Sequence, residues 1–265
     1  DTQISFFLWD NIAREPKFPF NKIKWGLTSY SFSKTNLVIC GNKDAQRLLR
    51  EKKGYFGPAV VLPQLGLTEN DYAGGKNHQL RQNFEIPEKT VVLGYAGRLA
   101  SEKGLLHLLQ AVKDVDNQNW CLLLLGGGPL EKEIKEQWKP VLGERLIMPG
   151  VVPHKEVPDY IRCMDVLLLP SVSTLRWVEQ FGLVLAQAML AGVPCIGSSS
   201  GAIPEVIGPG GLVFEEKNIK ALAETINILI EDETLRLELG EKALVYARSH
   251  YTHEAVVRKY LDAFG

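Results

Sequence analysis

Five short, predominantly apolar runs that alternate with helical patterns are the feature that most restricts the fold of this chain. The runs begin at Val91, Trp120, Arg145, Asp165 and Val193. They lack the apolar–polar alternation of a strand that has one solvated face. Runs of this kind predict strands buried on both faces, as in a parallel sheet.

Segments with apolar residues at helical spacing separate the five runs and continue after them. These segments are Glu102–Asp114, Leu130–Lys139, Lys155–Cys163, Gly182–Ala191, Ile219–Glu231, Thr234–Ser249 and Glu254–Phe264. Strand and helix in alternation predict an α/β fold with a doubly wound parallel sheet, of the Rossmann-like kind.

A smaller α/β unit precedes this alternation. Its predicted strands are FFLWDN, NLVICG and the short run 59–62, and its predicted helices are Ile23–Lys34 and Ala45–Lys53. The polar segment 63–88 has the glycines and the proline of a linker. We therefore expect the end of one Rossmann-like domain (1–62), an interdomain linker (63–88), a complete domain (89–249) and a C-terminal helix (250–265) that can pack back on the first domain.

Composition excludes several classes of protein. The 265 residues are 45% hydrophobic and 23% charged, which is typical of a globular protein, and the net charge of -1 does not suggest a nucleic-acid partner. The longest apolar runs are far shorter than the ~20 residues that span a bilayer. The four cysteines show no CxxC spacing, so we expect buried, reduced thiols in a cytoplasmic protein.

The start at Asp1, shortly before an apolar run, suggests a fragment of a longer protein.

Small residues and cations follow the predicted strands. The segments are GRLASEKG, GGGP, PGVV, PSVSTLRWVEQFG and GSSSGAIPE. In open α/β sheets, ligands bind beyond the carboxyl ends of the strands. The free N–H groups at a helix start, with the positive end of the helix dipole, favour anions, and Arg98 and Lys103 add positive charge. Together these loops predict a pocket for a diphosphate.

The same segments resemble a known family. GRLASEKG, LLLLGGGPLEKEI, MPGVVPHKEVPDYIRCMDVLLLPS and EQFGLVLAQAMLAGVPCIGSSSGAIPEVIG are similar to the C-terminal domain of the family-4 retaining glycosyltransferases, which have the GT-B fold. The resemblance covers roughly Val91 to Phe214. The part from LVICGNKDAQRLLREKKGY to LPQLGL is similar to the last portion of the family's N-terminal, acceptor-side domain and its linker.

The resemblance implies a role for each residue of the motifs. Arg98 and Lys103 would hold the diphosphate, and Glu179 would bind sugar hydroxyls; these three are the implied catalytic residues. Phe181, Gly182 and Leu183 would supply backbone donors to sugar and phosphate, and Val151 and Val152 would line the nucleobase. The remaining residues implied on the donor side are Gly97, Gly127, Val184 and Gln187.

Gln187 is where the chain departs from the family. It stands where the family has the second Glu of its E-x7-E signature, which accepts hydrogen bonds from both ribose hydroxyls. A Gln amide offers one acceptor group and one donor group, so the contact should survive in altered form. A charged acceptor is worth about 1 kcal/mol more than a neutral one. We therefore expect altered ribose binding rather than lost chemistry.

Two further expectations concern metal and acceptor. Asp114-Val115-Asp116 spells the metal motif DxD but is predicted at the wrong edge of the sheet, so we expect neither a metal nor another cofactor. Asp10 and Asn11 end a predicted strand and could face the cleft between the domains, where one of them would help to position sugar or acceptor.

The sequence thus predicts a retaining glycosyltransferase. Its donor would be a nucleotide sugar, with UDP-glucose or another UDP-hexose the best guess and GDP- or ADP-linked sugars open. Its acceptor would be a saccharide, a glycolipid or a small molecule. Contact with the inner face of a membrane stays open. The alternatives are a non-hydrolysing sugar-nucleotide epimerase of the same fold, and a nucleotide-sugar binding module without turnover.

Overall fold

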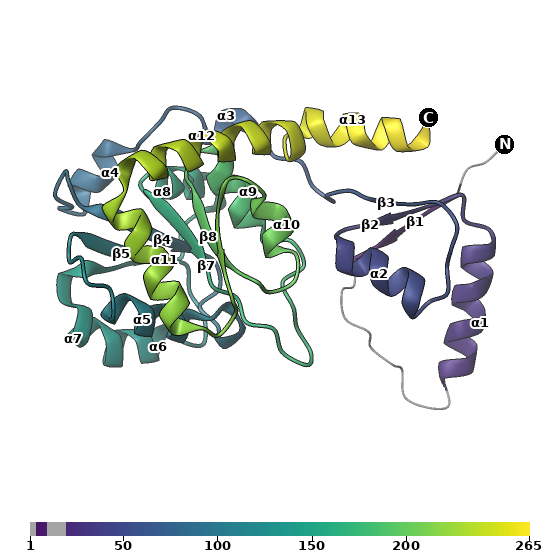
Figure 1. Ribbon diagram of the computed structural model, residues 1–265, viewed down its shortest axis with the longest axis horizontal. Helices are drawn as coiled ribbons and strands as arrows, with labels where there is room; N and C mark the ends of the chain where they lie inside the picture. The colour runs from purple at the N-terminus through teal and green to yellow at the C-terminus, as the bar shows by residue number, and fades with distance from the viewer. Residues whose placement is uncertain (1–3, 10–19) are drawn as a thin grey trace.

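A computed structural model describes residues 4–9 and 20–265 and arranges them around two parallel sheets (Figure 1). The larger sheet contains β4 (Val91–Ala96), β5 (Trp120–Leu125), β6 (Leu146–Gly150), β7 (Val166–Leu169), β8 (Cys195–Ser198) and β9 (Gly211–Phe214). The smaller contains β1 (Ser5–Leu8), β2 (Leu37–Cys40) and β3 (Ala59–Val61). The predicted α/β fold with a doubly wound parallel sheet is confirmed.

The order of strands in the larger sheet is β6-β5-β4-β7-β8-β9. The chain builds outward from β4 to β6 and then returns to place β7 on the other side of β4, with Leu93 opposite Val166. The loops that follow β4 and β7 therefore leave the sheet in opposite directions. Ligands of doubly wound sheets bind in the crevice at such a reversal.

Every residue of β4, β5, β7 and β8 is buried, which is why these strands read as continuous apolar runs. Helices supply the covering layers; α5 packs against α11, and α9 packs against α12. The helices of this part are α5 (Leu105–Lys113), α6 (Glu131–Glu133), α7 (Lys139–Leu142), α8 (Val157–Ile161), α9 (Leu183–Leu190), α10 (Ile203–Ile207), α11 (Ile219–Glu231), α12 (Glu233–His250) and α13 (His253–Phe264).

The smaller sheet has the order β1-β2-β3 and carries α1 (Phe20–Ser33) and α2 (Lys43–Glu51). All of β2 is buried because it is the central strand. Asn42 begins α2: its side-chain oxygen accepts a hydrogen bond from the Ala45 N–H, which is a favourable helix N-cap.

Two segments connect the sheets. Segment 63–88, expected as a linker, contains the short helices α3 (Glu69–Tyr72) and α4 (His78–Asn83), and it buries Tyr72 in the core of the larger sheet. Helix α13 extends from the larger sheet over the smaller one (Figure 1), where Tyr260 Oη donates to the Pro63 carbonyl at 3.2 Å. The exact domain boundaries stay a prediction.

Some elements differ from expectation. Strand β9 was not predicted because GLVF is short and only half-buried, so it lacks the signature of the central strands. The expected helix 130–139 is interrupted by a π-helical stretch, Ile134–Trp138, just before Pro140. All four cysteines are buried and free, as expected. Within residues 4–9 and 20–265, no helix is long and apolar enough to cross a membrane.

Candidate active site

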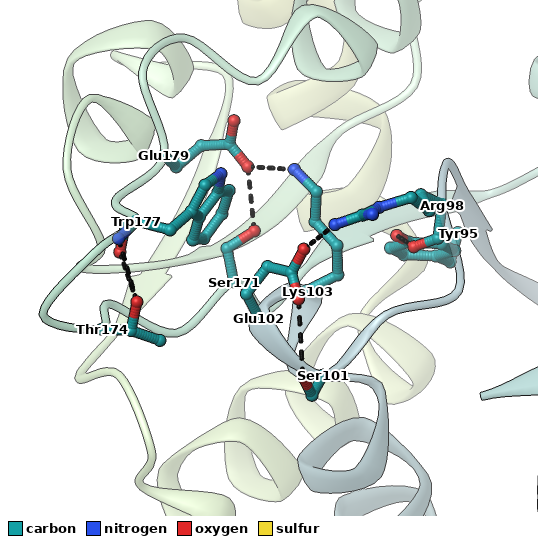
Figure 2. A network of polar contacts seen from close by, with 9 residues as sticks. All are labelled: Tyr95, Arg98, Ser101, Glu102, Lys103, Ser171, Thr174, Trp177 and Glu179. Carbon is teal, nitrogen blue, oxygen red and sulfur yellow. Dashed lines mark hydrogen bonds and ion pairs between the residues drawn. The ribbon is translucent and has the colours of Figure 1, made fainter. Parts of the chain in front are cut away.

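The centre of the site is an ion pair between the loops that follow β4 and β7. Lys103 Nζ lies 2.7 Å from Glu179 Oε2, and Ser171 Oγ donates to the same oxygen at 3.0 Å (Figure 2). Gly104, at φ 70°, brings the loops together, since a Cβ there would lie 1.9 Å from the Pro170 carbonyl oxygen. A glycine is thus required for Lys103 to reach Glu179.

Trp177 lies against the same lysine. Lys103 Nζ is 4.6 Å from the centre of the Trp177 ring, within the range of a cation–π contact (Figure 2). A tight turn presents this ring: Thr174 Oγ1 accepts the Trp177 N–H at 2.9 Å, and the Thr174 N–H donates to the Trp177 carbonyl at 2.8 Å. Lys103 is therefore held by a carboxylate and an aromatic face.

Arg98 is the second cation of the site and is more exposed, with 62% of its side chain accessible. It pairs with Glu102, four residues later (Figure 2). The backbone N–H of Glu102 and the charge of Arg98 hold the pKa of the Glu102 carboxyl below its usual range. Tyr95 Oη donates to the Arg98 carbonyl at 2.7 Å, and burial raises the Tyr95 pKa, so this hydroxyl keeps its proton.

The backbone of Glu179 is fixed by the loop after β8. The Ala202 N–H donates to the Glu179 carbonyl at 3.0 Å, and a Cβ on Gly201 would lie 2.1 Å from that oxygen. Helix α9 then begins after Gly182, at φ 78°. The N–H groups of its first turn lie close to Glu179 in sequence and supply the positive end of a helix dipole.

A cavity of about 340 Å³ opens beside this network. Its wall contains these residues predicted on the donor side: Gly97, Arg98, Gly127, Val151, Val152, Leu183, Val184 and Gln187. Arg98 belongs both to the cavity wall and to the network of Figure 2. The structure thus brings together residues from the loops after β4, β5 and β6 and from the start of α9.

Gln187 lies on α9 and is buried at the cavity. Its Nε2 donates to Tyr72 Oη at 2.8 Å. Burial raises the pKa of Tyr72, so the tyrosine stays neutral. The amide nitrogen of Gln187 is therefore engaged by α3, which leaves the carbonyl oxygen as the acceptor that can serve a ligand.

Other predicted residues lie elsewhere. Asp10 and Asn11 fall outside the described residues. Asp114 and Asp116 lie at the end of α5, which leads to the amino end of β5, so they occupy the edge of the sheet opposite the site. In the part of the chain that the structure describes, no group of three or more His, Cys, Asp or Glu could hold a metal ion.

Sequence reasoning missed several residues of this region: Tyr72, Glu102, His154, Val157, Ser171 and Trp177. Ser171 and Trp177 belong to the segment predicted after β7, but no pattern in that segment indicates which side chains face Lys103. Tyr72 reaches Gln187 from 115 positions away, and no local signal predicts such a contact.

The arrangement suits an anionic ligand with several hydroxyl groups. Two cations and a helix start can stabilise negative charge, whereas Glu179 offers a carboxylate to hydroxyl donors. The cavity wall next to them is mostly apolar, as expected for a flat heterocyclic group.

The chain matches one known protein family and several individual proteins. The sequence profile of the family "Glycosyl transferases group 1" matches residues 76–245, which is more than half of the chain. N-acetyl-alpha-D-glucosaminyl L-malate synthase of Bacillus anthracis is 32% identical over 186 residues, 69% of this chain and 47% of that protein. 2-Deoxystreptamine glucosyltransferase of Streptomyces kanamyceticus is 29% identical over 160 residues, 58% of this chain and 40% of that protein. The chain thus spans about half the length of these relatives.

The fold also matches solved structures. Alr3699/HepE of Anabaena, solved in complex with UDP, superposes with a TM-score of 0.82 at 21% identity, covering 99% of this chain and 72% of that protein. At this identity, the likeness shows the GT-B fold alone. The resemblance to family-4 glycosyltransferases stated from the sequence is confirmed.

Proposed function

We propose that this chain, which belongs to the group 1 glycosyl transferases, binds a nucleoside-diphosphate sugar and takes part in transferring the sugar, with retention of configuration, to a saccharide, glycolipid or small-molecule acceptor. The observation that carries the proposal is the pairing of Lys103 with Glu179 at 2.7 Å, at the sheet edge where β4 and β7 diverge. The proposed donor is UDP-glucose or another UDP-hexose.

The proposed chemistry follows the movement of charge. As a nucleoside diphosphate leaves a sugar, negative charge grows on its β-phosphate while the anomeric carbon becomes cationic. Fixed donors aimed at the phosphate stabilise this transition state more than the ground state. In our proposal Lys103, Arg98 and the first turn of α9 act on the phosphates, and the reaction needs no divalent metal.

The remaining groups would bind the two ends of the donor. Glu179 would accept hydrogen bonds from sugar hydroxyls, with Lys103 and Ser171 fixing its carboxylate. Val151 and Val152 would lie along the nucleobase, and the Gln187 carbonyl would accept from the ribose. The UDP in the complex of Alr3699/HepE supports a uridine nucleotide as the first donor to test.

Calorimetry with UDP, GDP and ADP tests the nucleotide specificity directly on this chain. We expect UDP to bind most tightly, and Lys103→Met to weaken it. If none of the three nucleotides binds, the proposal is wrong.

Turnover of the matching sugar nucleotide by the intact protein tests the reaction. We expect transfer to an added acceptor, retention of anomeric configuration by NMR, and activity that persists in EDTA. Interconversion of the donor without acceptor would indicate an epimerase instead. Donor binding without sugar release would indicate a binding module.

A further inference from the structure

We call the smaller sheet with α1 and α2 the smaller sheet unit, and the larger sheet with its covering helices the larger sheet unit. The start of helix α2, in the smaller sheet unit, lies against the loop that carries Glu179. Asn42 is 1% exposed although it is polar, so the oxygen and the nitrogen of its side-chain amide both need hydrogen-bond partners. Its Oδ1 accepts from the Ala45 N–H at 2.8 Å and caps the helix. Its Nδ2 donates to the Gln180 carbonyl at 2.9 Å, across 138 positions of sequence.

A second hydrogen bond joins the same helix start to the larger sheet unit. The Lys43 N–H donates to Glu205 Oε2, on α10, at 3.1 Å. The first N–H groups of a helix have no partner within the helix, and a carboxylate is favourable beside them. Glu205 therefore stabilises a helix of the other sheet unit.

Aromatic packing supports this contact. The Trp9 ring lies 6.4 Å from the Phe181 ring. Gly41 makes room for Trp9, since a Cβ at residue 41 would lie 1.8 Å from the indole. The contacts of Trp9 and Asn42 converge on Gln180 and Phe181, which directly follow Glu179.

Two consecutive carbonyls of this loop thus accept hydrogen bonds from different units. The Glu179 carbonyl accepts from Ala202 within the larger sheet unit, whereas the Gln180 carbonyl accepts from Asn42 of the smaller one. The loop is therefore held by hydrogen bonds from both units.

We propose that Asn42 and Glu205 form an interdomain clasp that positions the Glu179–Phe181 loop, so that the loop adopts its sugar-binding geometry only when the two units are in contact. Asn42 acts as a positioning residue and does not itself touch the donor. The proposal rests on the proposed function for the statement that Glu179 contacts the donor sugar.

Asn42→Asp and Asn42→Ser separate the clasp from the helix cap. Both side chains still cap α2, but neither donates to the Gln180 carbonyl: the carboxylate has no donor and the serine is too short. Asn218→Ser is the matched control, because Asn218 caps α11 by accepting from the Ala221 N–H at 3.0 Å.

Amide hydrogen exchange by NMR reads the clasp without any ligand. The Lys43 amide is hydrogen-bonded to Glu205 across the interface. In both Asn42 variants the Asn42–Gln180 hydrogen bond is lost, and we expect the weakened interface to let the Lys43 amide exchange about tenfold faster, as for the loss of one hydrogen bond. The Ala45 amide, bonded to the cap, should stay protected. Unchanged exchange at Lys43 in both variants would overturn the clasp.

Donor binding reads the consequence for the loop. We expect the Asn42 variants to bind the sugar nucleotide about tenfold more weakly and to bind the free nucleotide as tightly as the unmodified chain does. The Asn218→Ser control should bind both ligands with unchanged affinity. Faster Lys43 exchange with unchanged sugar-nucleotide affinity would overturn the positioning role. If the unmodified chain binds no sugar nucleotide, the proposed function fails, and the exchange data still decide whether the clasp exists.

Discussion

Two buried carboxylates flank β7, and their surroundings differ. Asp165, at the amino end of the strand, meets Arg81 at 2.6 Å, Lys76 at 2.5 Å and the Val92 N–H at 2.7 Å. Glu179, beyond the carboxyl end, meets Lys103 at 2.7 Å. The Arg81 side chain is 7% exposed, whereas that of Lys103 is 21% exposed and lies at the edge where ligands bind.

The two ion pairs differ in how completely protein groups surround them. Arg81 also donates from Nε to the Cys163 carbonyl at 2.9 Å, so both members of the Asp165 pair are enclosed by protein partners. Among the described residues, Lys103 donates to Glu179 and lies over Trp177, which leaves N–H groups for an anion. We therefore expect the first pair to control stability and the second to control ligand chemistry.

Removing the charge of Asp165 should have the largest effect. Asp165→Asn leaves the Arg81 guanidinium buried without its carboxylate, and breaking such a pair costs about 3–5 kcal/mol of the free energy of unfolding. Urea denaturation measures this loss. The exposed pair Lys220–Glu224 is the control, since Glu224→Gln should change stability by less than about 0.5 kcal/mol. Equal losses in the two variants would contradict the structural role of Asp165.

Removing the charge of Lys103 should act on turnover instead. Lys103→Met should lower kcat/KM of the intact protein by about 10²–10³-fold, as expected when one donor to the developing charge is lost. Its effect on stability should be smaller than that of Asp165→Asn, because Ser171 still donates to Glu179. Lys113→Met, at the exposed C-terminal end of α5, the helix that begins two residues after Lys103, is the matched control. Unchanged turnover in Lys103→Met would remove Lys103 from the chemistry.

The distinction between the pairs was only half visible in the sequence. Lys103 was predicted because it follows an apolar run, whose burial pattern shows where a strand ends, and Glu179 was predicted because its segment resembles the E-x7-E signature of the family. Arg81 lies in a polar segment expected to be a linker, and its partner is 84 positions away. Nothing local predicts that pairing, since it depends on the placement of α4 beside the amino end of β7.

Burial and element length also determine which parts of the fold could be predicted. The central strands were found because burial on both faces makes them wholly apolar, and β4 and β5 begin at the predicted Val91 and Trp120. Short elements such as β9 and α10 contain too few residues for a period to be seen. The Asn42–Gln180 contact is unpredictable for a further reason, because the N-cap role alone accounts for an asparagine at residue 42.

Acid should weaken the Asp165 pair. Burial raises the pKa of Asp165, but Arg81, Lys76 and the Val92 N–H outweigh burial and hold this pKa below its usual range. Because the folded pKa is the lower one, ionised Asp165 stabilises the fold above about pH 4, and this contribution is lost as the pH falls through the folded pKa. Urea midpoints measured below pH 4 should therefore fall more steeply in the unmodified chain than in Asp165→Asn. Parallel slopes would show that Asp165 is not linked to acid unfolding.

Gln187→Glu should give the smallest effect. It tests whether a new carboxylate at the cavity serves the ligand, as expected of Glu179, or only the structure, as expected of Asp165. The Tyr72 hydroxyl, which now accepts from Gln187 Nε2 at 2.8 Å, can turn and donate to the new carboxylate. A charged acceptor should then strengthen UDP binding by about 1 kcal/mol, or roughly fivefold, as measured by calorimetry. Tyr72→Phe in the same background should reduce the gain, because the buried carboxylate loses its donor. Unchanged UDP affinity in Gln187→Glu would mean that residue 187 does not contact the ribose and serves only to anchor α3.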